Sequence, residues 1–453
     1  MTGNLSSILT WGTIATSALL FTLLWWRRWM LVKPSFITVL FFHLTVQWGA
    51  VFLADEYLPA LPVPAHLVAL ILGFPVCTAL LSALTFRRSA RSLLRTAVLV
   101  GLRPRGAPLN LMALVFLILG ITVIYLLFVP PRLTGLYAII FRPGDATIAR
   151  EEALALLPHT WLRYAVSAVN SSLAPLVAVI GLSLSVNRWQ RNHHALPWSF
   201  LLLGFPLLMM VVSLSGARAP AGMLVLHTVF AVFLLRGFPL TPLRLVLAAI
   251  IVLMPPMMIS LLRNADGLSV ATFLYHFGDI LDRTAARAAQ PAFWNVLYAQ
   301  EHGLFGVSAI PKLAMLFGQP TVDQFNQVYL AYNPDGLESG TANTAVVFAY
   351  YGAFGLIGLP VAVGLTLAAD GILPLLRKLS LRVRIPCLSV CCIAATQFAA
   401  TSFTTVLVTH GFLLSLMVGA GLDLLFHLIQ HPGTRCPPSP YAHLPAHHGS
   451  QAI

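Results

Sequence analysis

The sequence contains very little charge. Of its 453 residues only 9% are Asp, Glu, Lys or Arg, whereas a soluble domain carries about 25%. Hydrophobic residues make up 58% of the chain, and the mean hydropathy is +0.84. Long apolar runs recur throughout, and the alternating ten-residue pattern of membrane β-barrels is missing. The composition therefore excludes a water-soluble fold and predicts an all-α, polytopic transmembrane helical bundle.

Basic residues are absent from the first apolar stretch, Met1 to Trp26, and Arg27 and Arg28 follow directly after it. A cleaved signal peptide carries its positive charge ahead of the apolar stretch. We therefore predict that this stretch is an uncleaved helix with its N-terminus outside the cell.

Apolar runs compatible with membrane-spanning helices recur along the chain. Their approximate bounds are 5–26, 35–54, 64–86, 110–130, 161–186, 196–214, 219–235, 245–262, 343–369, 385–408 and 411–430. Because a span needs about 20 residues, we expect about eleven transmembrane helices in one membrane domain over residues 1–430. Long outer loops are expected at 131–160 and 263–342. Residues 431–453 are rich in Pro and His and predict a disordered cytoplasmic tail.

Acidic residues are scarce, 14 against 27 Lys and Arg, which gives a net charge of +13. With the predicted spans, most of the basic residues fall on one side of the membrane, where the only acidic residues are Asp370 and Asp423. Cytoplasmic loops are enriched in Lys and Arg in this way. The excess positive charge is therefore an orientation signal, and we expect no nucleic-acid partner.

Cysteine is also rare, with five in the chain. Cys77, Cys387, Cys391 and Cys392 fall in predicted spans and Cys436 in the tail, so no disulfide is expected in an outer loop. Cys387 and Cys391 share a helix face, which small buried apolar side chains explain better than a metal site. We predict neither a metal nor a cofactor.

Few ionisable residues lie inside the predicted spans. They are His43, His227, Asp370, Asp423 and His427. The last three lie near cytoplasmic helix ends, where we expect them to reach water. A transporter coupled to protons or sodium usually holds carboxylates near the middle of the bilayer, so their absence argues against that class but not against an uncoupled transporter.

The outer loop at 263–342 is far longer than ordinary connections, and such loops are usually functional. Its stretch from Val270 to Ala289 has the pattern of a short amphipathic helix, and the loop as a whole is expected to be partly helical. Two explanations of its charges remain open. Asp279 and Arg283 form an i,i+4 pair on a solvated face, or Arg283 and Arg287 contact an anionic ligand through their planar guanidinium groups.

A second polar feature is the tight outer turn from Ser213 to Gly222, which carries Arg218. Arg263 occupies the matching depth where the following span leaves the membrane. Either arginine reaches a lipid-linked phosphate or simply extends to lipid headgroups.

Polar residues also crowd the end of the long loop. Glu338, Thr341 and Asn343 are candidates to hold a sugar or to support a catalytic arginine, and Asn343 is alternatively a helix cap. The helix that follows begins with three regularly spaced glycines: Gly352, Gly355 and Gly358. Small residues at this spacing favour close helix packing in lipid rather than chemistry.

Three stretches together resemble the Wzy-type O-antigen and oligosaccharide repeat-unit polymerases, which are related in fold to the O-antigen ligases. They are Ser215-Gly-Ala-Arg218 before a short helix, Gly340-Thr-Ala-Asn-Thr344 after a long outer loop, and Tyr350-Tyr-Gly-Ala-Phe-Gly-Leu-Ile-Gly358 at the start of a helix. The resemblance covers about residues 196–370. The N-terminal third matches only in hydropathy.

The resemblance implies a metal-independent glycosyltransferase of the bacterial inner membrane, acting on undecaprenyl-diphosphate-linked glycans at the periplasmic face. Arg218 matches the arginine of the family motif; with Arg263, Arg283 or Arg287 it would stabilise charge on the leaving diphosphate. The candidates that accept a proton from the sugar hydroxyl are Glu301, His302 and Glu338. A flippase and a chain-length regulator are the implied partners.

Other classes remain open. The related ligases often carry a His before the helix that follows the long loop, where this chain has Thr341, Asn343 and Thr344, and this favours a polymerase. A lipid-linked glycan flippase would need a large basic central cavity, whereas the basic residues here lie at membrane surfaces. A scaffold would explain the hydropathy but not the arginines and polar residues of the outer loops.

Overall fold

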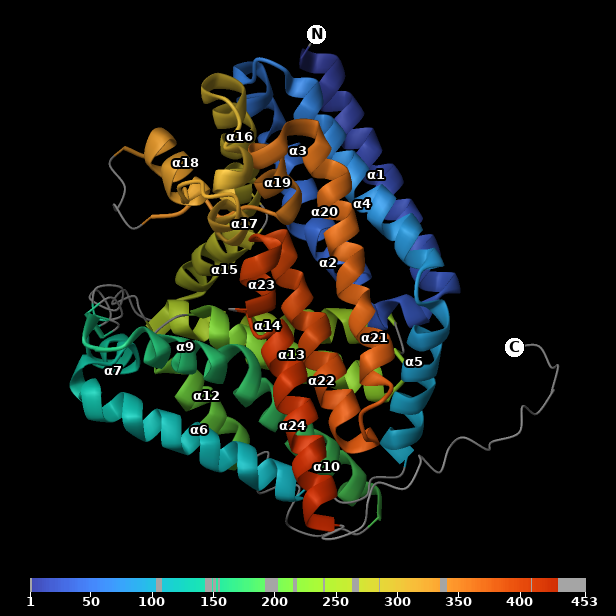
Figure 1. Cartoon of the computed structure of the whole chain (residues 1–453), viewed down its shortest axis with the longest axis vertical. Helices are drawn as coiled ribbons and strands as arrows, with labels where there is room; N and C mark the ends of the chain where they lie inside the picture. Colours follow the sequence, from blue (N-terminus) through green and yellow to red (C-terminus); the bar gives the residue numbers. More distant parts are fainter. Residues whose placement is uncertain are drawn as a thin grey trace, which may run out of the picture.

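The computed structural model describes residues 2–102, 108–142, 149, 152–153, 155–191, 203–214, 218–238, 241–262, 269–284, 286–334, 340–408 and 410–430. All regular secondary structure in these ranges is helical, which confirms the predicted all-α class. Figure 1 shows the helices and their order. The predicted tail at 431–453 lies outside the described residues.

The first third of the chain forms helices α1 (Thr2–Trp26), α2 (Pro34–Phe42), α3 (Trp48–Tyr57), α4 (Pro64–Leu84) and α5 (Arg87–Leu102). A π-helical turn at His43–Gln47 joins α2 to α3, so that the two form one apolar span. Helix α5 differs from the others because it is amphipathic and rich in arginine. It is not among the helices apolar enough to cross a membrane.

The described part of the middle third contains helices of very different lengths. They are α6 (Pro108–Phe128), α7 (Gly135–Phe141), α9 (Thr160–Ala168), α10 (Ala174–Arg191), α12 (Phe205–Ser213), α13 (Arg218–Leu235) and α14 (Pro242–Leu262). A π-helical turn at Val169–Leu173 joins α9 to α10. Helix α7 falls within the predicted outer loop at 131–160.

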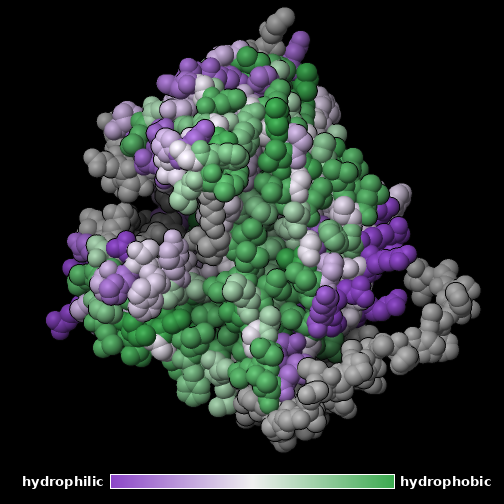
Figure 2. All heavy atoms as spheres, viewed as in Figure 1, coloured by the Kyte–Doolittle hydropathy of each residue, from purple (hydrophilic) through white to green (hydrophobic). Residues whose placement is uncertain are grey.

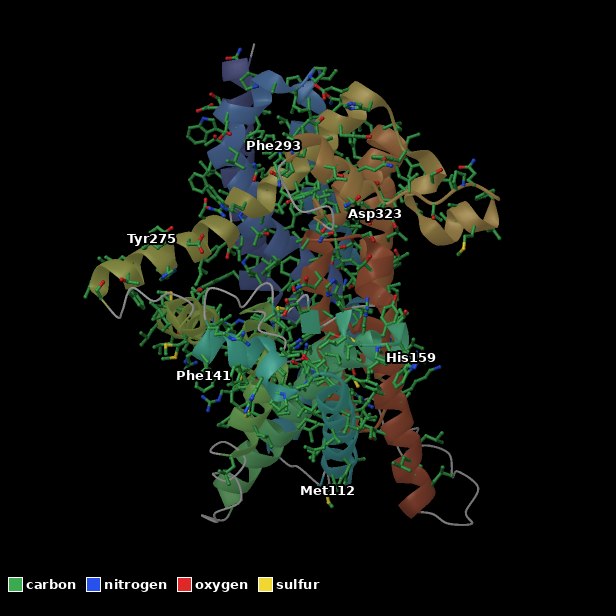
Figure 3. The ribbon with its side chains drawn as sticks, turned by 90° about the vertical axis from the view of Figure 1, so that its left-hand side faces the viewer. Met112, Phe141, His159, Tyr275, Phe293 and Asp323 are labelled. Carbon is green, nitrogen blue, oxygen red and sulfur yellow. The ribbon has the colours of Figure 1, made fainter. Side chains whose placement is uncertain are left out.

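The long loop predicted at 263–342 is largely helical where it is described, as expected. It contains α15 (Val270–Thr284), α16 (Ala286–His302), α17 (Pro311–Leu316) and α18 (Gln324–Tyr332). The predicted amphipathic helix from Val270 to Ala289 corresponds to α15 and the first turn of α16, and residue 285 between them lies outside the described residues. In Figure 3, α15 projects from the body of the molecule, and its Tyr275 is exposed.

The last third comprises α19 (Val346–Phe354), α20 (Gly358–Ala368), α21 (Ile372–Leu376), α22 (Leu381–Ala394), α23 (Phe403–Val408) and α24 (Phe412–Gln430). The core joins these helices to the N-terminal ones, since α2 packs against α4, α20 and α22. The fully buried ring of Phe42 lies 5.0 Å from that of Phe74 and 6.2 Å from that of Phe348, measured between centroids. Distant parts of the sequence therefore share one apolar core.

Seven of the described helical segments are long and apolar enough to cross a membrane. They are 4–26, 34–60, 64–84, 160–182, 242–261, 346–376 and 403–425. Three apolar helices are shorter, at 112–128, 219–235 and 383–399. The chain thus has the character of a multi-pass membrane protein, but the predicted count of eleven spans is not confirmed. Part of the predicted span at 196–214 lies outside the described residues.

The expectation that Asp370 reaches water at a helix end is wrong. The helical segment that carries it continues to Leu376, so Asp370 is not at a helix end. Its side chain is fully buried, and Oδ2 lies 3.0 Å from Nζ of Lys33, which is also fully buried. Ser35 donates two further hydrogen bonds to this carboxylate, from its N–H (3.0 Å) and its hydroxyl (2.7 Å). The Lys33 ammonium also donates to the carbonyl oxygens of Ser82 and Thr85 at the end of α4.

Asp423 is also buried, with 9% of its surface exposed. Its Oδ2 accepts a hydrogen bond from the N–H of Ser380, while its Oδ1 has no partner. His427 is exposed, as expected. The buried cysteines pair with backbone groups, since Cys387 and Cys391 each donate to a carbonyl oxygen of the neighbouring helix region.

Candidate functional site

Helix α16 of the long loop is fixed to the membrane helices by side-chain amides. Gln290 donates from Nε2 to the hydroxyl of Tyr57, at 2.7 Å. Gln300, near the other end of α16, exchanges two hydrogen bonds with the backbone of Val63, at 3.0 and 3.1 Å. Between them, Ala292, Phe293 and Val296 are buried in the core. Helix α16 is therefore a rigid support at one end of the molecule.

A buried amide pair holds the loop against α16 and α19. Gln324 donates from Nε2 to Oδ1 of Asn295 (3.0 Å) and to the carbonyl of Ala349 (3.2 Å). Asn295 in turn donates to the carbonyl of Ala342, at 3.3 Å. A Cβ atom on Gly352 would lie 2.5 Å from the Gln324 amide. Glycine at this position is therefore what lets the amide of Gln324 approach α19.

Gly355 and Gly358, which the sequence predicted to favour close helix packing, have contacts with nearby parts of the chain. Gly355 ends α19 with a φ of 64°, a conformation that disfavours other residues. A Cβ on Gly358, the first residue of α20, would collide with the carbonyl of Tyr350 in the preceding helix, α19. Gly355 and Gly358 therefore permit the break between α19 and α20. The closest neighbours of a Cβ at the three glycines belong to Gln324, Leu304 and Tyr350, none of which lies in a distant membrane-spanning helix.

The exposed end of α16 carries an aromatic cluster, defined here as Trp294, Tyr298, His302, Phe305 and Tyr332. Ring centroids of neighbouring members lie 4.4 to 6.5 Å apart. The closest pair is Tyr298 and His302, which stack at 4.4 Å, and Tyr298 also stacks on Phe305. Members of the cluster are exposed or half-buried, so their faces are partly available to solvent.

A carboxylate lies at the edge of the aromatic cluster. The hydroxyl of Tyr332, at the end of α18, donates to Oε2 of Glu301 at 2.8 Å. Burial of the phenol, together with the hydrogen bond and the negative charge of Glu301, raises the pKa of Tyr332 above its usual value. The phenol therefore stays protonated and acts as a donor. Glu301 is exposed, so its carboxylate has acceptor capacity left for another hydroxyl.

The sequence prediction included Glu301 and His302 but missed Trp294, Tyr298 and Tyr332. Trp294, Tyr298 and His302 follow one another at every fourth position of α16. Residues at this spacing lie on one face of a helix, so this signal was available in the sequence. The contribution of Tyr332 comes from α18 through tertiary packing and carries no comparable signal.

Thr341 and Asn343 lie together and exposed at the end of the loop, where Asn343 Nδ2 donates to Thr341 Oγ1 at 3.0 Å. The alternative prediction that Asn343 caps a helix is wrong. Helix α19 begins three residues later, at Val346, and its N-cap residue is Ala345. The carbonyl of Ala342 accepts a hydrogen bond from Asn295 on α16, and residues 341–345 are not helical.

Arg287 is separated from this cluster. Its guanidinium binds Asp282 on α15, with Nε to Oδ2 at 2.6 Å, and its Nη2 lies 4.0 Å from Asp279. Because an α-helix rises about 1.5 Å per residue, Arg287 and Glu301 are roughly 20 Å apart along α16. Arg287 and Glu301 therefore cannot contact the same glycosidic bond.

Arg218 begins α13, although its side chain lies outside the described part of the structure. The end of α12, the helix before it, is close to α7, since the N–H of Leu136 donates to the carbonyl of Leu214 at 3.2 Å. One turn into α13, Gly222 packs against Pro256 of α14. Arg263 and Glu338 lie outside the described residues, as does the side chain of Arg283.

The candidate residues that the structure describes are therefore spread over separate regions rather than one pocket. One region is the aromatic cluster with Glu301, and the other is the start of α13, beside α7 and α14. In Figure 2 the surface is hollowed between the region of α17 and α18 and the region of α9. Figure 3 shows α16, around Phe293, extending away from α7, around Phe141.

Comparisons with known proteins find no matching family model, no matching curated protein and no matching solved structure. Among the residues that the structure describes, no three His, Cys, Asp or Glu side chains are grouped so that they could hold a metal ion.

Proposed function

We propose that this protein is a membrane glycosyltransferase that polymerises lipid-diphosphate-linked oligosaccharide repeat units, with undecaprenyl diphosphate as the carrier, at the outer face of a bacterial inner membrane. The observation that carries the proposal is the hydrogen bond from Tyr332 to Glu301 inside the exposed aromatic cluster of α16. The resemblance of the Arg218 turn and of the segment from Gly340 to Gly358 to the polymerases supports it further.

The aromatic cluster has the chemistry of a sugar-binding surface. Sugar rings present C–H groups on their faces, which pack against aromatic rings, and hydroxyl groups at their edges, which need fixed hydrogen-bond partners. Tyr298 and Trp294 supply the rings, while the carboxylate of Glu301 and the phenol oxygen of Tyr332, whose hydrogen is donated to Glu301, supply acceptors for sugar hydroxyls. Thr341 and Asn343 add exposed polar groups on the neighbouring segment of the loop.

The separation of the candidate residues suits an extended substrate. In the proposed reaction Arg218 contacts the lipid diphosphate and stabilises the charge that develops on it as the glycosidic bond breaks. The aromatic cluster holds a more distant part of the glycan. In this proposal Glu301 and His302 bind sugar, and they are not the base that takes the proton of the attacking hydroxyl.

Two alternatives remain. A ligase would use the same lipid-linked donor but transfer finished glycan to a different acceptor. A transporter is favoured by one specific observation, the buried pair of Lys33 and Asp370 inside the helical bundle, because ionisable groups at such places often mark transport pathways. The hydrogen bonds from Ser35 and to Ser82 and Thr85 satisfy this pair within the protein, which favours a structural role.

The function is tested by deleting the gene and examining surface glycan and lipid-linked intermediates on gels. A polymerase predicts that glycan of a single repeat unit stays on the surface and that the long-chain ladder is lost. Absent surface glycan with accumulated long lipid-linked polymer identifies a ligase instead. An unchanged ladder rules out both transferases.

Glu301→Gln and Trp294→Ala are expected to shorten the glycan ladder without abolishing it, because each removes one sugar contact far from the breaking bond. With purified protein and lipid-linked repeat units, we expect KM to rise about tenfold, the effect of losing one or two hydrogen bonds or ring contacts, and kcat to change little. Loss of a general base would instead lower kcat by about 10²–10⁴-fold.

The matched control is Asp323→Asn, which removes one negative charge from the same loop. Asp323 caps α18 through the N–H of Asn326, and asparagine is an equally good cap. A kcat for Glu301→Gln that falls a hundredfold at unchanged KM would show that Glu301 acts on the reacting hydroxyl.

A further inference from the structure

A cationic depression that is open at the surface, called the cavity below, lies at the opposite end of α1 from the N-terminus. It has a volume of about 550 Å³ and lies between the end of α1, the 3-10 helix Arg28–Val32 and the amphipathic helix α5. The residues that line it include three tryptophans and three arginines: Trp25, Trp26, Trp29, Arg28, Arg91 and Arg95. Figure 2 shows hydrophilic side chains gathered on the side where α1 ends and α5 runs.

The arginines of the cavity form no ion pair with an acidic residue in the part of the chain that the structure describes. The described ion pairs of the chain involve Lys33 with Asp370 and Arg287 with Asp279 and Asp282, and none of them includes Arg28, Arg91 or Arg95. Burial and the nearby charges of Arg87 and Arg27 lower the pKa of Arg91 from its usual value, although an arginine stays charged. Positive charge is thus concentrated here, and no described acidic residue compensates it.

The indole of Trp29 is fixed within this cavity. The guanidinium carbon of Arg91 lies 5.6 Å from the centre of its ring, and Nζ of Lys33 lies 5.8 Å from it. Only 6% of the Trp29 surface is exposed, and its buried Nε1–H has no hydrogen-bond partner among the residues that the structure describes. A buried donor without an acceptor is costly, and because Trp29 lines the cavity together with the arginines, an anionic acceptor from outside the chain would relieve this cost.

The other two tryptophans point to where that acceptor comes from. Trp25 and Trp26 are 67% and 78% exposed at the end of a membrane-length apolar helix. Tryptophan at such a position is typical of the boundary between lipid chains and headgroups. The apolar side of α5 is buried through Ala90, Leu93 and Ala97, which leaves its arginines at the surface at this same level.

We propose that this cavity binds the phosphate headgroup of an anionic phospholipid. Arg28, Arg91 and Arg95 contact the phosphate oxygens, the Nε1–H of Trp29 donates to one of them, and Trp25 and Trp26 pack beside the upper part of the acyl chains. A phospholipid suits both parts of the site because its phosphate matches the arginines and its chains match the exposed indoles. The site is independent of the glycan chemistry proposed at the other end of the molecule.

The test measures lipid binding to the purified full-length chain in neutral detergent by native mass spectrometry and by thermal unfolding. Phosphatidylglycerol is titrated against phosphatidylcholine, and inorganic phosphate is titrated alone. We expect saturable binding of phosphatidylglycerol and a higher unfolding temperature. Arg91→Gln and Arg95→Gln should each weaken binding about tenfold or more, and Trp29→Phe, which keeps the ring and removes only the N–H, about fivefold.

Arg244→Gln is the matched control, because Arg244 is an exposed arginine at the start of α14 that does not line the cavity. Equal weakening by Arg244→Gln and Arg91→Gln would overturn the site in favour of general attraction to surface charge. Equal stabilisation by inorganic phosphate would overturn the assignment to a lipid. Unchanged binding in Trp29→Phe would remove the indole from the site, and should Arg91→Gln fail to fold, Arg95→Gln and Trp29→Phe still decide the outcome.

Discussion

Lys33→Met is expected to destabilise the protein by about 3–5 kcal/mol, because it leaves the buried carboxylate of Asp370 without its cation. Both side chains are fully buried, and their charged atoms lie 3.0 Å apart. The pair joins the start of α2 to the segment between α20 and α21, which are far apart in the sequence. Thermal unfolding in detergent and the amount of protein in membranes measure the effect.

Combining Lys33→Met with Asp370→Asn should recover most of that loss, because the second change removes the uncompensated charge. Asparagine keeps an oxygen that accepts the hydrogen bonds from Ser35. The two single variants and the double variant form a mutant cycle that isolates the energy of the pair. Additive losses in the cycle would show that the two side chains do not stabilise each other.

The same variants separate a structural role from transport. If the pair only holds the helices together, the double variant makes a normal glycan ladder once its abundance is restored. A stable double variant with no surface glycan and with lipid-linked repeat units trapped on the inner side would favour the transporter class for this protein.

The sequence was sufficient for the helical class because hydropathy reports directly on the environment of each segment. It also predicted the helical nature of the long loop, since the apolar periodicity of α15 is local to that helix. The predicted helix reached Ala289, and residues 286–289 are helical as the first turn of α16.

Predictions that depend on tertiary contacts failed or were missed. Asn343 has the side chain of a helix cap, but α19 begins only at Val346. The segment before it is hydrogen-bonded to α16 through the carbonyl of Ala342 and the amide of Asn295. Asp370 looked like a residue at a helix end because hydropathy falls there, whereas the helical segment continues and Lys33 packs against it. In each case a partner distant in the sequence decides the local structure.

Arg218→Ala is expected to abolish the long-chain glycan ladder and to leave single repeat units on the surface, with membrane abundance unchanged. The proposed guanidinium contact with the leaving diphosphate forms as charge develops, and removing one such contact costs about 10²–10³ in rate. Arg218 is the first residue of α13, so its backbone lies at a helix boundary.

The matched control is Arg236→Ala, because Arg236 lies directly after the other end of the same helix and is exposed. It should leave the ladder unchanged, and equal loss in both variants would mean that the arginines only anchor α13 in the membrane. Arg218→Lys keeps the positive charge but loses the planar pair of donors, so we expect this variant to lose the long-chain glycan ladder as well. Full activity of Arg218→Lys would show that the diphosphate requires a positive charge at this position and not two parallel hydrogen bonds.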